Sequence, residues 1–154
     1  MSFTQKILAP TDFSPASALA LDATALLAKQ FDAEVTLLYI YDPTLLSPLY
    51  VVPGAAALTA PVQEPREFEA GARGELARLR DERLGGVKRV DLLVQQHANA
   101  AEGICEAVKT VGADLIVLST HGRTGLAHLF IGSVAERVVR YATCPVLTMR
   151  SKAK

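Results

Sequence analysis

Short apolar segments alternate with amphipathic ones along the 154-residue chain, and this alternation limits the fold more than any other feature. Each apolar segment gives way to proline, glycine or polar residues, as the strands of a sheet do. The five segments are KILAP (6–10), AEVTLLYIYD (33–42), VKRVDLLVQQ (87–96), ADLIVLS (113–119) and CPVLTMR (144–150). Because helices between parallel strands form right-handed crossovers, the pattern predicts a single α/β domain over residues 1–154, with an open, parallel, five-stranded sheet covered by helices on both faces.

Residues typical of helix ends mark the intervening helices. Ser14 stands where a side chain can cap a helix, and Pro15 takes the first helical position, which tolerates a missing N–H. Asn99 and Glu102 have the spacing of an N-cap and an N3 residue, and Gly112 ends the helix that follows them. The sequence therefore predicts where two of the helices begin.

The helix expected within residues 11–31 has a wide apolar face. We expect this face to cover the sheet, because apolar residues at helical spacing line the buried side of a surface helix. They fall on two neighbouring lines: Leu19, Ala23 and Leu26, and Ala20, Leu27 and Phe31.

Residues 43–63 carry no charged side chain, and the segment 43–64 contains Pro48, Pro53 and Pro61, which oppose regular structure. We interpret them as a long irregular loop within the domain. Such loops are uncommon in compact domains and are often functional. Two interpretations remain open: the apolar residues of the loop pack over the sheet edge or a partner subunit, or they form a docking surface for a specific partner.

Charge and composition exclude several classes of function. Sixteen basic residues balance sixteen acidic ones, and the only basic cluster is the tail MRSKAK, so nucleic-acid binding is not expected. No apolar run reaches the roughly 18 residues of a membrane span, and MSFTQKILAP does not resemble a secretory signal, so we expect a cytoplasmic protein without membrane association. Cys105 and Cys144 match no metal-binding spacing and are interpreted as reduced, structural thiols.

Two polar loops follow predicted strands, at the carboxyl ends where parallel sheets bind their ligands. PTDFS follows the first strand, and STHGRTGLAHLFIGS (119–133) follows the fourth. Gly132 and Ser133 would begin a helix whose free N–H groups attract an anion. Asp12 has two interpretations: it binds a ribose hydroxyl or a metal through water, or it satisfies the first turn of the helix after Ser14. Neither GxxxxGK[ST] nor GxGxxG after the first strand is present.

Four stretches, KILAPTDFS, EVTLLYIYD, ADLIVLSTHGRTGL and GSVAERVVRYATCPVL, together resemble the universal stress protein family across essentially the whole chain. The resemblance implies a Rossmann-like fold similar to that of adenine nucleotide alpha hydrolases. ATP-binding members carry Gly-x2-Gly-x9-Gly-Ser/Thr. Gly122, Gly132 and Ser133 match this motif, but Ser119 replaces its first glycine. Serine is small and can donate a hydrogen bond, so we expect the replacement to be tolerated.

The resemblance implies that ATP binds at the loops described above. The nucleoside would contact the first loop and the backbone of the second strand, the sugar would contact the end of the fourth strand, and the phosphates would contact the glycine motif. Asp12 would also approach a magnesium ion bound to the nucleotide. Arg123 and His121 would neutralise phosphate charge, or else be solvated loop residues. The implied nucleotide-binding residues are Pro10, Thr11, Asp12, Ile40, Leu118, Ser119, Gly122, Arg123, Gly132, Ser133 and Val134.

Hydrolysis of ATP has less support in the sequence. Phosphoryl transfer needs a positioned water, a metal and cations on the developing charge. Asp12 and Ser133 could contact the metal, and Arg123 could supply a cation. No residue is marked as a general base, and His128 is better explained as a packing or surface residue. We therefore expect at most slow turnover.

The resemblance implies that the last strand lies at a sheet edge, where an apolar strand invites pairing with another chain. The resemblance implies a homodimer through Val146, Leu147 and Met149; the alternative is an edge covered by a loop of the same chain. Two functions remain open: a nucleotide-dependent stress-response or regulatory protein, and a protein-interaction module of the same fold that binds no nucleotide.

Overall fold

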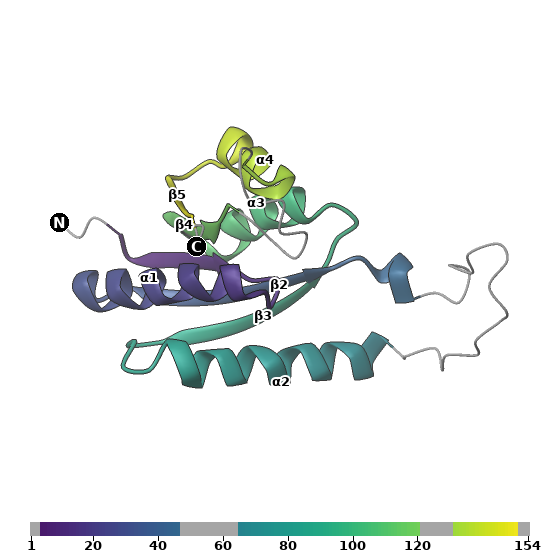
Figure 1. Cartoon of the computed structure of the whole chain (residues 1–154), viewed down its shortest axis with the longest axis horizontal. Coiled ribbons are helices and arrows are strands. Elements are labelled where there is room, and N and C mark those ends of the chain that lie inside the picture. The colour runs from purple at the N-terminus through teal and green to yellow at the C-terminus, as the bar shows by residue number, and fades with distance from the viewer. Residues whose placement is uncertain (1–3, 47–64, 121–130, 151–154) are drawn as a thin grey trace, which may run out of the picture.

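The strand β1 (Lys6–Pro10) lies at the centre of a five-stranded sheet with the order β3-β2-β1-β4-β5 (Figure 1). The computed structural model describes residues 4–46, 65–120 and 131–150. All four strand pairs are parallel, which confirms the predicted fold class. The order reverses between β1 and β4, so this is the switch point at which such sheets bind ligands. The other strands are β2 (Glu34–Tyr41), β3 (Val90–Gln96), β4 (Leu115–Ser119) and β5 (Val146–Met149).

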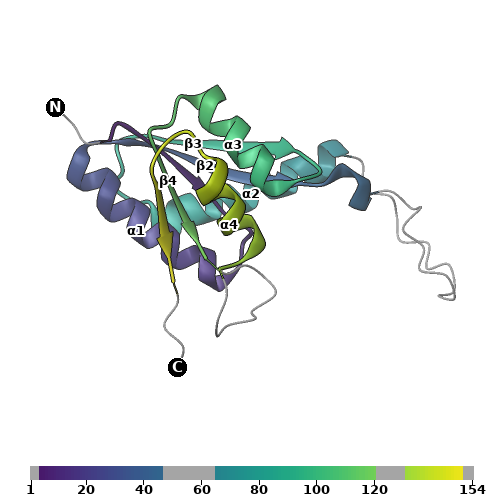
Figure 2. The ribbon, with the colours of Figure 1, turned by 90° about the horizontal axis from the view of Figure 1, so that it is seen from above.

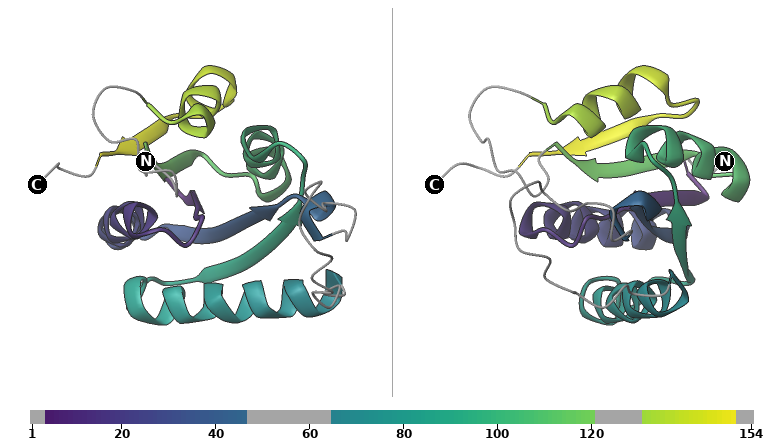
Figure 3. Two further views of the ribbon diagram at one scale, coloured as in Figure 1. Left: turned by 45° about the vertical axis from the view of Figure 1, so that its right-hand side comes forward. Right: turned by 90° about the vertical axis from the view of Figure 1, so that its right-hand side faces the viewer.

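Helices cover both faces of the sheet, as Figure 3 shows from two sides. The first face packs on α1 (Pro15–Phe31) and α2 (Pro65–Arg83), around a core cluster that includes Ile7, Leu21 and Leu76. The second face packs on α3 (Ala100–Val111) and α4 (Ser133–Tyr141), around a separate core cluster. None of the helices in the described residues is both long and apolar enough to cross a membrane.

The predicted caps form as expected. The Ser14 side chain accepts a hydrogen bond from the Ser17 N–H at 3.2 Å, and the Asn99 side chain accepts from two N–H groups in the first turn of α3. Gly112 ends α3 in the left-handed conformation, with a φ of 67° that favours glycine. Each such N-cap stabilises its helix by about 1 kcal/mol.

The predicted buried face of α1 is partly wrong. Leu26 is 72% exposed and Leu19 is 43% exposed, because α1 turns its smaller residues toward the sheet. Small side chains let the helix lie close to β1 and β4. The hydroxyls of Ser17 and Thr24 are satisfied there by hydrogen bonds to the carbonyls of the preceding turn. The buried residues of α1 are Ser17, Ala20, Leu21, Thr24, Ala25 and Ala28.

The segment predicted as an irregular loop, residues 43–64, begins with regular structure. Pro43–Leu46 form a short 3-10 helix, η1, in which the Asp42 carboxylate accepts hydrogen bonds from the N–H and hydroxyl of Thr44. These bonds end β2 in an Asx turn, which proline at position 43 supports with its fixed φ. Residues 47–64 lie outside the described ranges.

Candidate functional site

A pocket of about 350 Å³ lies at the carboxyl ends of the strands, at the switch point between β1 and β4. This volume is in the range of small-molecule sites. β1, β2 and β4 supply its floor, and α3 and α4 supply its walls. The lining residues are Pro10, Thr11, Asp12, Ser17, Leu38, Ile40, Ala100, Ile104, Leu118, Ser119, Thr120, Gly132, Ser133, Val134 and Ala135.

Nine of the eleven residues that the sequence indicated for nucleotide binding line this one pocket, although they come from four separate parts of the chain. Gly122 and Arg123 lie outside the described residues, as do His121 and His128. The nine residues are Pro10, Thr11, Asp12, Ile40, Leu118, Ser119, Gly132, Ser133 and Val134.

At Ile40, the backbone of β2 presents to the pocket an N–H and a C=O that have no partner within the described parts of the chain. The Leu38 carbonyl accepts from the Thr11 N–H on the β1 side at 2.9 Å, and the Tyr41 carbonyl accepts from the His97 N–H on the β3 side at 3.0 Å. Neighbouring residues of a strand direct their peptide groups to opposite sides, so the N–H and C=O of Ile40 point toward the β1 side. Pairing with β1 stops at Leu38, and both groups therefore face the space beyond the end of β1.

The loop from β1 to α1 is held by its own hydrogen bonds. The hydroxyls of Thr11 and Ser17 lie 2.9 Å apart, and the Phe13 N–H donates to Thr11 Oγ1 at 3.1 Å. The Ser14 N–H donates to Asp12 Oδ1 at 3.0 Å, which is the structural role that the sequence allowed for Asp12. Because Asp12 also lines the pocket, the two interpretations of this residue are compatible.

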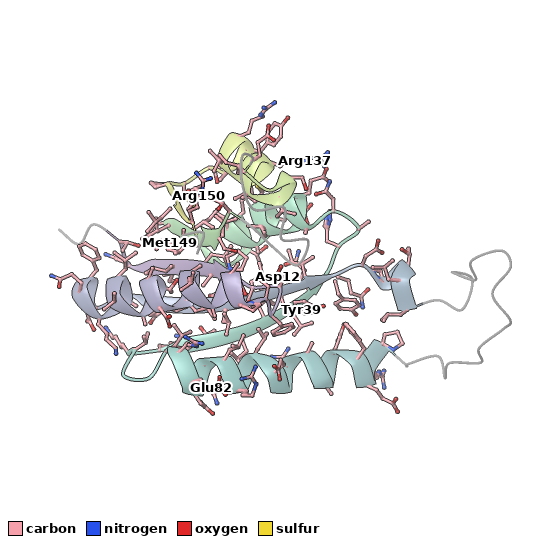
Figure 4. The ribbon with its side chains drawn as sticks, in the orientation of Figure 1. Asp12, Tyr39, Glu82, Arg137, Met149 and Arg150 are labelled. Carbon is pink, nitrogen blue, oxygen red and sulfur yellow. The ribbon has the colours of Figure 1, made fainter. Side chains whose placement is uncertain are left out.

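Phe13 carries backbone strain directly beside the pocket. Its φ of 63° is in the left-handed region, which a bulky side chain rarely adopts. The ring packs on the other side of β2 from the pocket, with its centroid 4.5 Å from that of Tyr39, and the Tyr39 ring lies 6.5 Å from that of Phe68 on α2. Figure 4 shows Asp12 and Tyr39 at the carboxyl ends of the central strands. The aromatic contacts stabilise the turn that directs Asp12 to the pocket.

The N-terminus of α4 opens into the pocket without a side-chain cap. Its N-cap residue is Gly132, whose own N–H donates to the Thr120 carbonyl at 2.7 Å. Glycine has no side chain that could accept hydrogen bonds from the N–H groups of the first helical turn. Ser133, Val134 and Ala135 follow, and all three line the pocket. The free N–H groups and the helix dipole give this wall a partial positive charge, which favours an anion.

Gly103 on α3 is a feature of the site that the sequence analysis missed. A Cβ atom there would lie 2.7 Å from Ile40 Cδ1 and 3.0 Å from His97 Cβ, so glycine allows α3 to approach the end of β2. Ala100 and Ile104 on the same helix line the pocket and were also missed. A glycine in the middle of a helix was the only signal in the sequence.

The histidine and the two cysteines among the described residues lie outside the lining of this pocket. His97 Nδ1 accepts from the Asn99 N–H at 2.9 Å, and His97 lies outside the pocket lining. Cys105 and Cys144 are free thiols whose pKa values are raised by burial, which makes them less reactive. Among the described residues, no group of three or more His, Cys, Asp or Glu side chains is arranged to hold a metal ion.

The fold and the pocket define a doubly wound parallel α/β protein with a ligand-sized cavity at its switch point. A model of the universal stress protein family matches residues 4–150, and the chain belongs to this family. The chain is 36% identical to universal stress protein MJ0531 of Methanocaldococcus jannaschii over 97% of this chain and 84% of the relative. It is 32% identical to universal stress protein YxiE of Bacillus subtilis over 94% and 98% of the two chains.

Solved structures share the fold over nearly their whole length. The structure of protein MJ0577 has a TM-score of 0.75 at 26% identity and covers 97% of this chain and 98% of its own. More distant universal stress proteins, at 15 to 20% identity, have been solved in complex with cAMP, with dAMP for the Archaeoglobus fulgidus protein, and with AMP for an Arabidopsis thaliana protein. These three have TM-scores of 0.65, 0.61 and 0.59 with this chain.

Proposed function

We propose that this chain binds an adenine nucleotide, and ATP in particular, in the pocket between β1, β2 and β4, and acts in the cytoplasm as a nucleotide-dependent stress-response or regulatory protein. The observation that carries the proposal is that nine residues, which the family resemblance implied and which come from four parts of the chain, line one pocket of suitable size. The complexes of related folds with cAMP, dAMP and AMP support an adenine nucleotide as the ligand. The free state of both cysteines agrees with a reducing compartment.

The polar groups of the pocket suit the three parts of a nucleotide. The free N–H and C=O of Ile40 would pair with the edge of adenine, while the side chains of Leu118 and Ile104 supply apolar walls for the base and sugar. The Asp12 carboxylate would accept from a ribose hydroxyl. The N–H groups at the start of α4, with the Ser133 hydroxyl, would donate to the phosphate oxygens.

A magnesium ion would be held mainly by the nucleotide. Magnesium sites at nucleotides use one or two carboxylates together with phosphate oxygens and water. Asp12 is the only carboxylate among the described residues that line the pocket, so it is the protein group that would approach such an ion, directly or through water.

The residues that line the pocket are consistent with at most slow hydrolysis of ATP. Asp12 is the only titratable side chain in the described lining, and one of its oxygens already accepts from the Ser14 N–H. Activation of a water molecule needs a free base within hydrogen-bond reach of it. The proposed role is therefore that of a nucleotide sensor with at most slow hydrolysis of ATP.

We also propose a homodimer through β5. The Pro145 carbonyl accepts a hydrogen bond from the Ile116 N–H of β4, and the Met149 carbonyl accepts one from the Thr120 N–H just after β4. The peptide groups of Val146 and Thr148 therefore point outward from the sheet. β5 runs beside β4 at the end of the sheet order (Figure 2), and its Leu147 side chain is 38% exposed. An uncharged edge strand of this kind pairs readily with a second copy.

The opposite edge of the sheet is protected and supports the choice of β5. At β3, the outward carbonyl of Leu92 accepts a hydrogen bond from Arg73 Nη1 at 3.0 Å, and Asp91 pairs with Arg89, which directly precedes the strand. Charged side chains over an edge are a common way to prevent pairing with another chain. The alternative for β5, a cover formed by a loop of the same chain, would leave the protein monomeric.

The first test is the nucleotide content of freshly purified, denatured protein by ion-exchange chromatography, followed by calorimetric titration of the stripped protein with ATP. We expect bound adenine nucleotide, and loss of affinity in a Gly132→Val variant, whose side chain would enter the phosphate wall. Thermal unfolding of the variant checks that it folds. Mostly ADP in the purified protein would instead indicate slow hydrolysis.

Absence of bound nucleotide, together with no titration heat at millimolar ATP, would refute the proposal. It would favour the second candidate, a protein-interaction module that binds no nucleotide. The observation in favour of that candidate is Ser119, which places a side chain where ATP-binding members of the family have bare backbone.

A further inference from the structure

A second cleft, of about 670 Å³, lies between α3 and α4 and meets the proposed nucleotide pocket at Ser133, which lines both. The cleft is mostly polar at its α4 wall and includes four charged side chains. Its lining residues are Ala101, Glu102, Cys105, Ser133, Glu136, Arg137, Arg140 and Tyr141.

Three of the four charged side chains in this cleft already have partners. Arg140 Nη2 donates to Glu136 Oε1 at 2.9 Å, and Asn99 Nδ2 donates to Glu102 Oε1 at 3.2 Å. Arg137 forms no hydrogen bond or ion pair with any residue in the described ranges. Its guanidinium is therefore available to a ligand without loss of an existing ion pair.

Arg137 is placed to reach the phosphate wall of the pocket. It follows Ser133 by four residues, so the two side chains share one face of α4 and are separated by about 6 Å along the helix axis. Side chains on a helix lean toward its N-terminus, which for Arg137 is the direction of Ser133 and the pocket. Figure 4 shows Arg137 on α4, above the strand ends where Asp12 lies.

We infer that Arg137 binds the terminal phosphate of a nucleoside triphosphate and so makes the site select triphosphates over monophosphates. This inference rests on the proposed function. The N–H groups of the first turn of α4 would hold the phosphates nearest the sugar, and the terminal phosphate would extend past Ser133 into the second cleft. Arginine suits this position because its planar fork can donate two hydrogen bonds to one phosphate.

The test is calorimetric titration of the stripped wild-type chain, an Arg137→Met variant and an Arg140→Met variant with ATP and with AMP, in the presence of magnesium. Methionine keeps much of the apolar stem and removes the charge. Arg140→Met is the matched control, because Arg140 lines the same cleft but is paired with Glu136. Arg137 lies on the exposed surface of α4, and thermal unfolding of both variants checks that they fold as the wild type does.

We expect the wild type to prefer ATP to AMP, and Arg137→Met to lose roughly tenfold in ATP affinity, as for a charge-assisted contact to phosphate, with AMP affinity unchanged. An ATP affinity of Arg137→Met within twofold of the wild type, or an equal loss for AMP, would overturn the inference and leave the proposed function intact. An equal loss from Arg140→Met would also overturn it, because general positive charge would then explain the effect. Failure of every adenine nucleotide to bind the wild type would refute the proposed function itself.

Discussion

Gly103 controls the shape of the pocket through the residue that it touches. An alanine Cβ there would lie 2.7 Å from Ile40 Cδ1, and Ile40 lines the pocket. The end of the isoleucine side chain can move away, but the space open to it is the pocket. Alanine has a better helix propensity than glycine, by about 1 kcal/mol, and this offsets part of the cost of the close contact with Ile40. We predict that Gly103→Ala changes the free energy of unfolding by no more than about 2 kcal/mol and lowers ATP affinity several-fold.

Gly71→Ala is the matched control for that variant. A Cβ at Gly71, on α2, would meet nothing within 4 Å, so the substitution should stabilise the protein by about 0.5–1 kcal/mol and leave ATP affinity unchanged. Urea unfolding and calorimetric titration measure the two quantities. Unchanged ATP affinity in Gly103→Ala would mean that Ile40 does not shape the binding site.

Asp114 connects the beginning of the chain to β4 and makes stability depend on pH. Partial burial raises the pKa of Asp114, but hydrogen bonds from the Thr4 hydroxyl and from the N–H groups of Gln5 and Lys6 outweigh burial and hold the pKa below its usual value. A carboxyl group whose pKa is lower in the folded state stabilises the protein above its unfolded pKa of about 3.9. This stabilisation is lost as the pH falls below that value and through the folded pKa.

We predict that Asp114→Asn lowers the free energy of unfolding at pH 7 by about 1 kcal/mol. Hydrogen bonds to a charged group often contribute more, but Asp114 is at the surface, where water competes for them. The difference from the wild type should shrink as the pH falls from 4 toward 2. Urea unfolding across this range measures it. Asp22→Asn, which removes a surface pair with Arg83, is the control and should have a smaller effect at pH 7. A difference that stays constant with pH would contradict the assignment.

At the scale of elements, β5 is where a partner chain is expected, and a charge in this strand should prevent pairing. We predict that Leu147→Lys prevents the proposed dimer from forming and leaves a monomer, because the lysine would lie within the apolar edge. Leu26→Lys on α1 is the control: Leu26 is more exposed, at 72%, but it belongs to a helix and should leave the dimer intact. Sedimentation velocity measures both. A wild type that is monomeric at high concentration would exclude the dimer.

The elements themselves were largely predictable, because strand and cap signals are local. KILAP, ADLIVLS and the caps at Ser14 and Asn99 each carry their signal within a few residues. The orientation of α1 was not predictable from its leucines. Close packing on a sheet favours small residues, and hydrogen-bonded Ser17 and Thr24 are as acceptable there as alanine.

The pocket was predictable only in part, because some of its residues carry a local signal and others are placed by the packing of a helix. Residues of the loops after β1 and β4 were found, because strand ends can be located from the sequence and the family motif marks them. Ala100, Ile104 and Gly103 depend on how α3 crosses the end of β2, which is a property of tertiary packing. The strained turn at Phe13 was also missed, since no glycine or asparagine signals its positive φ.

At the scale of the whole molecule, the pocket joins parts of the chain that are far apart in sequence. Its walls come from β1 and β2 on one side of the switch point, β4 on the other, and the helices α3 and α4 above them. Local unfolding of any of these elements would destroy the pocket. A nucleotide bound there should therefore stabilise the fold as a whole, because it binds the native state and not the unfolded chain.

The size of this effect follows from binding linkage. ATP at 100 times its dissociation constant would add about 2.7 kcal/mol to the free energy of unfolding. For a domain of about this size, 1 kcal/mol raises the Tm by about 2–4 °C, so we predict a rise of roughly 5–10 °C, which grows with the logarithm of ATP concentration. Thermal unfolding at increasing ATP measures it, with Gly132→Val as the control that should not respond. A Tm that is equally raised by GTP would show that the Ile40 backbone does not select adenine, because the two bases present opposite hydrogen-bonding groups at the edge that would face it.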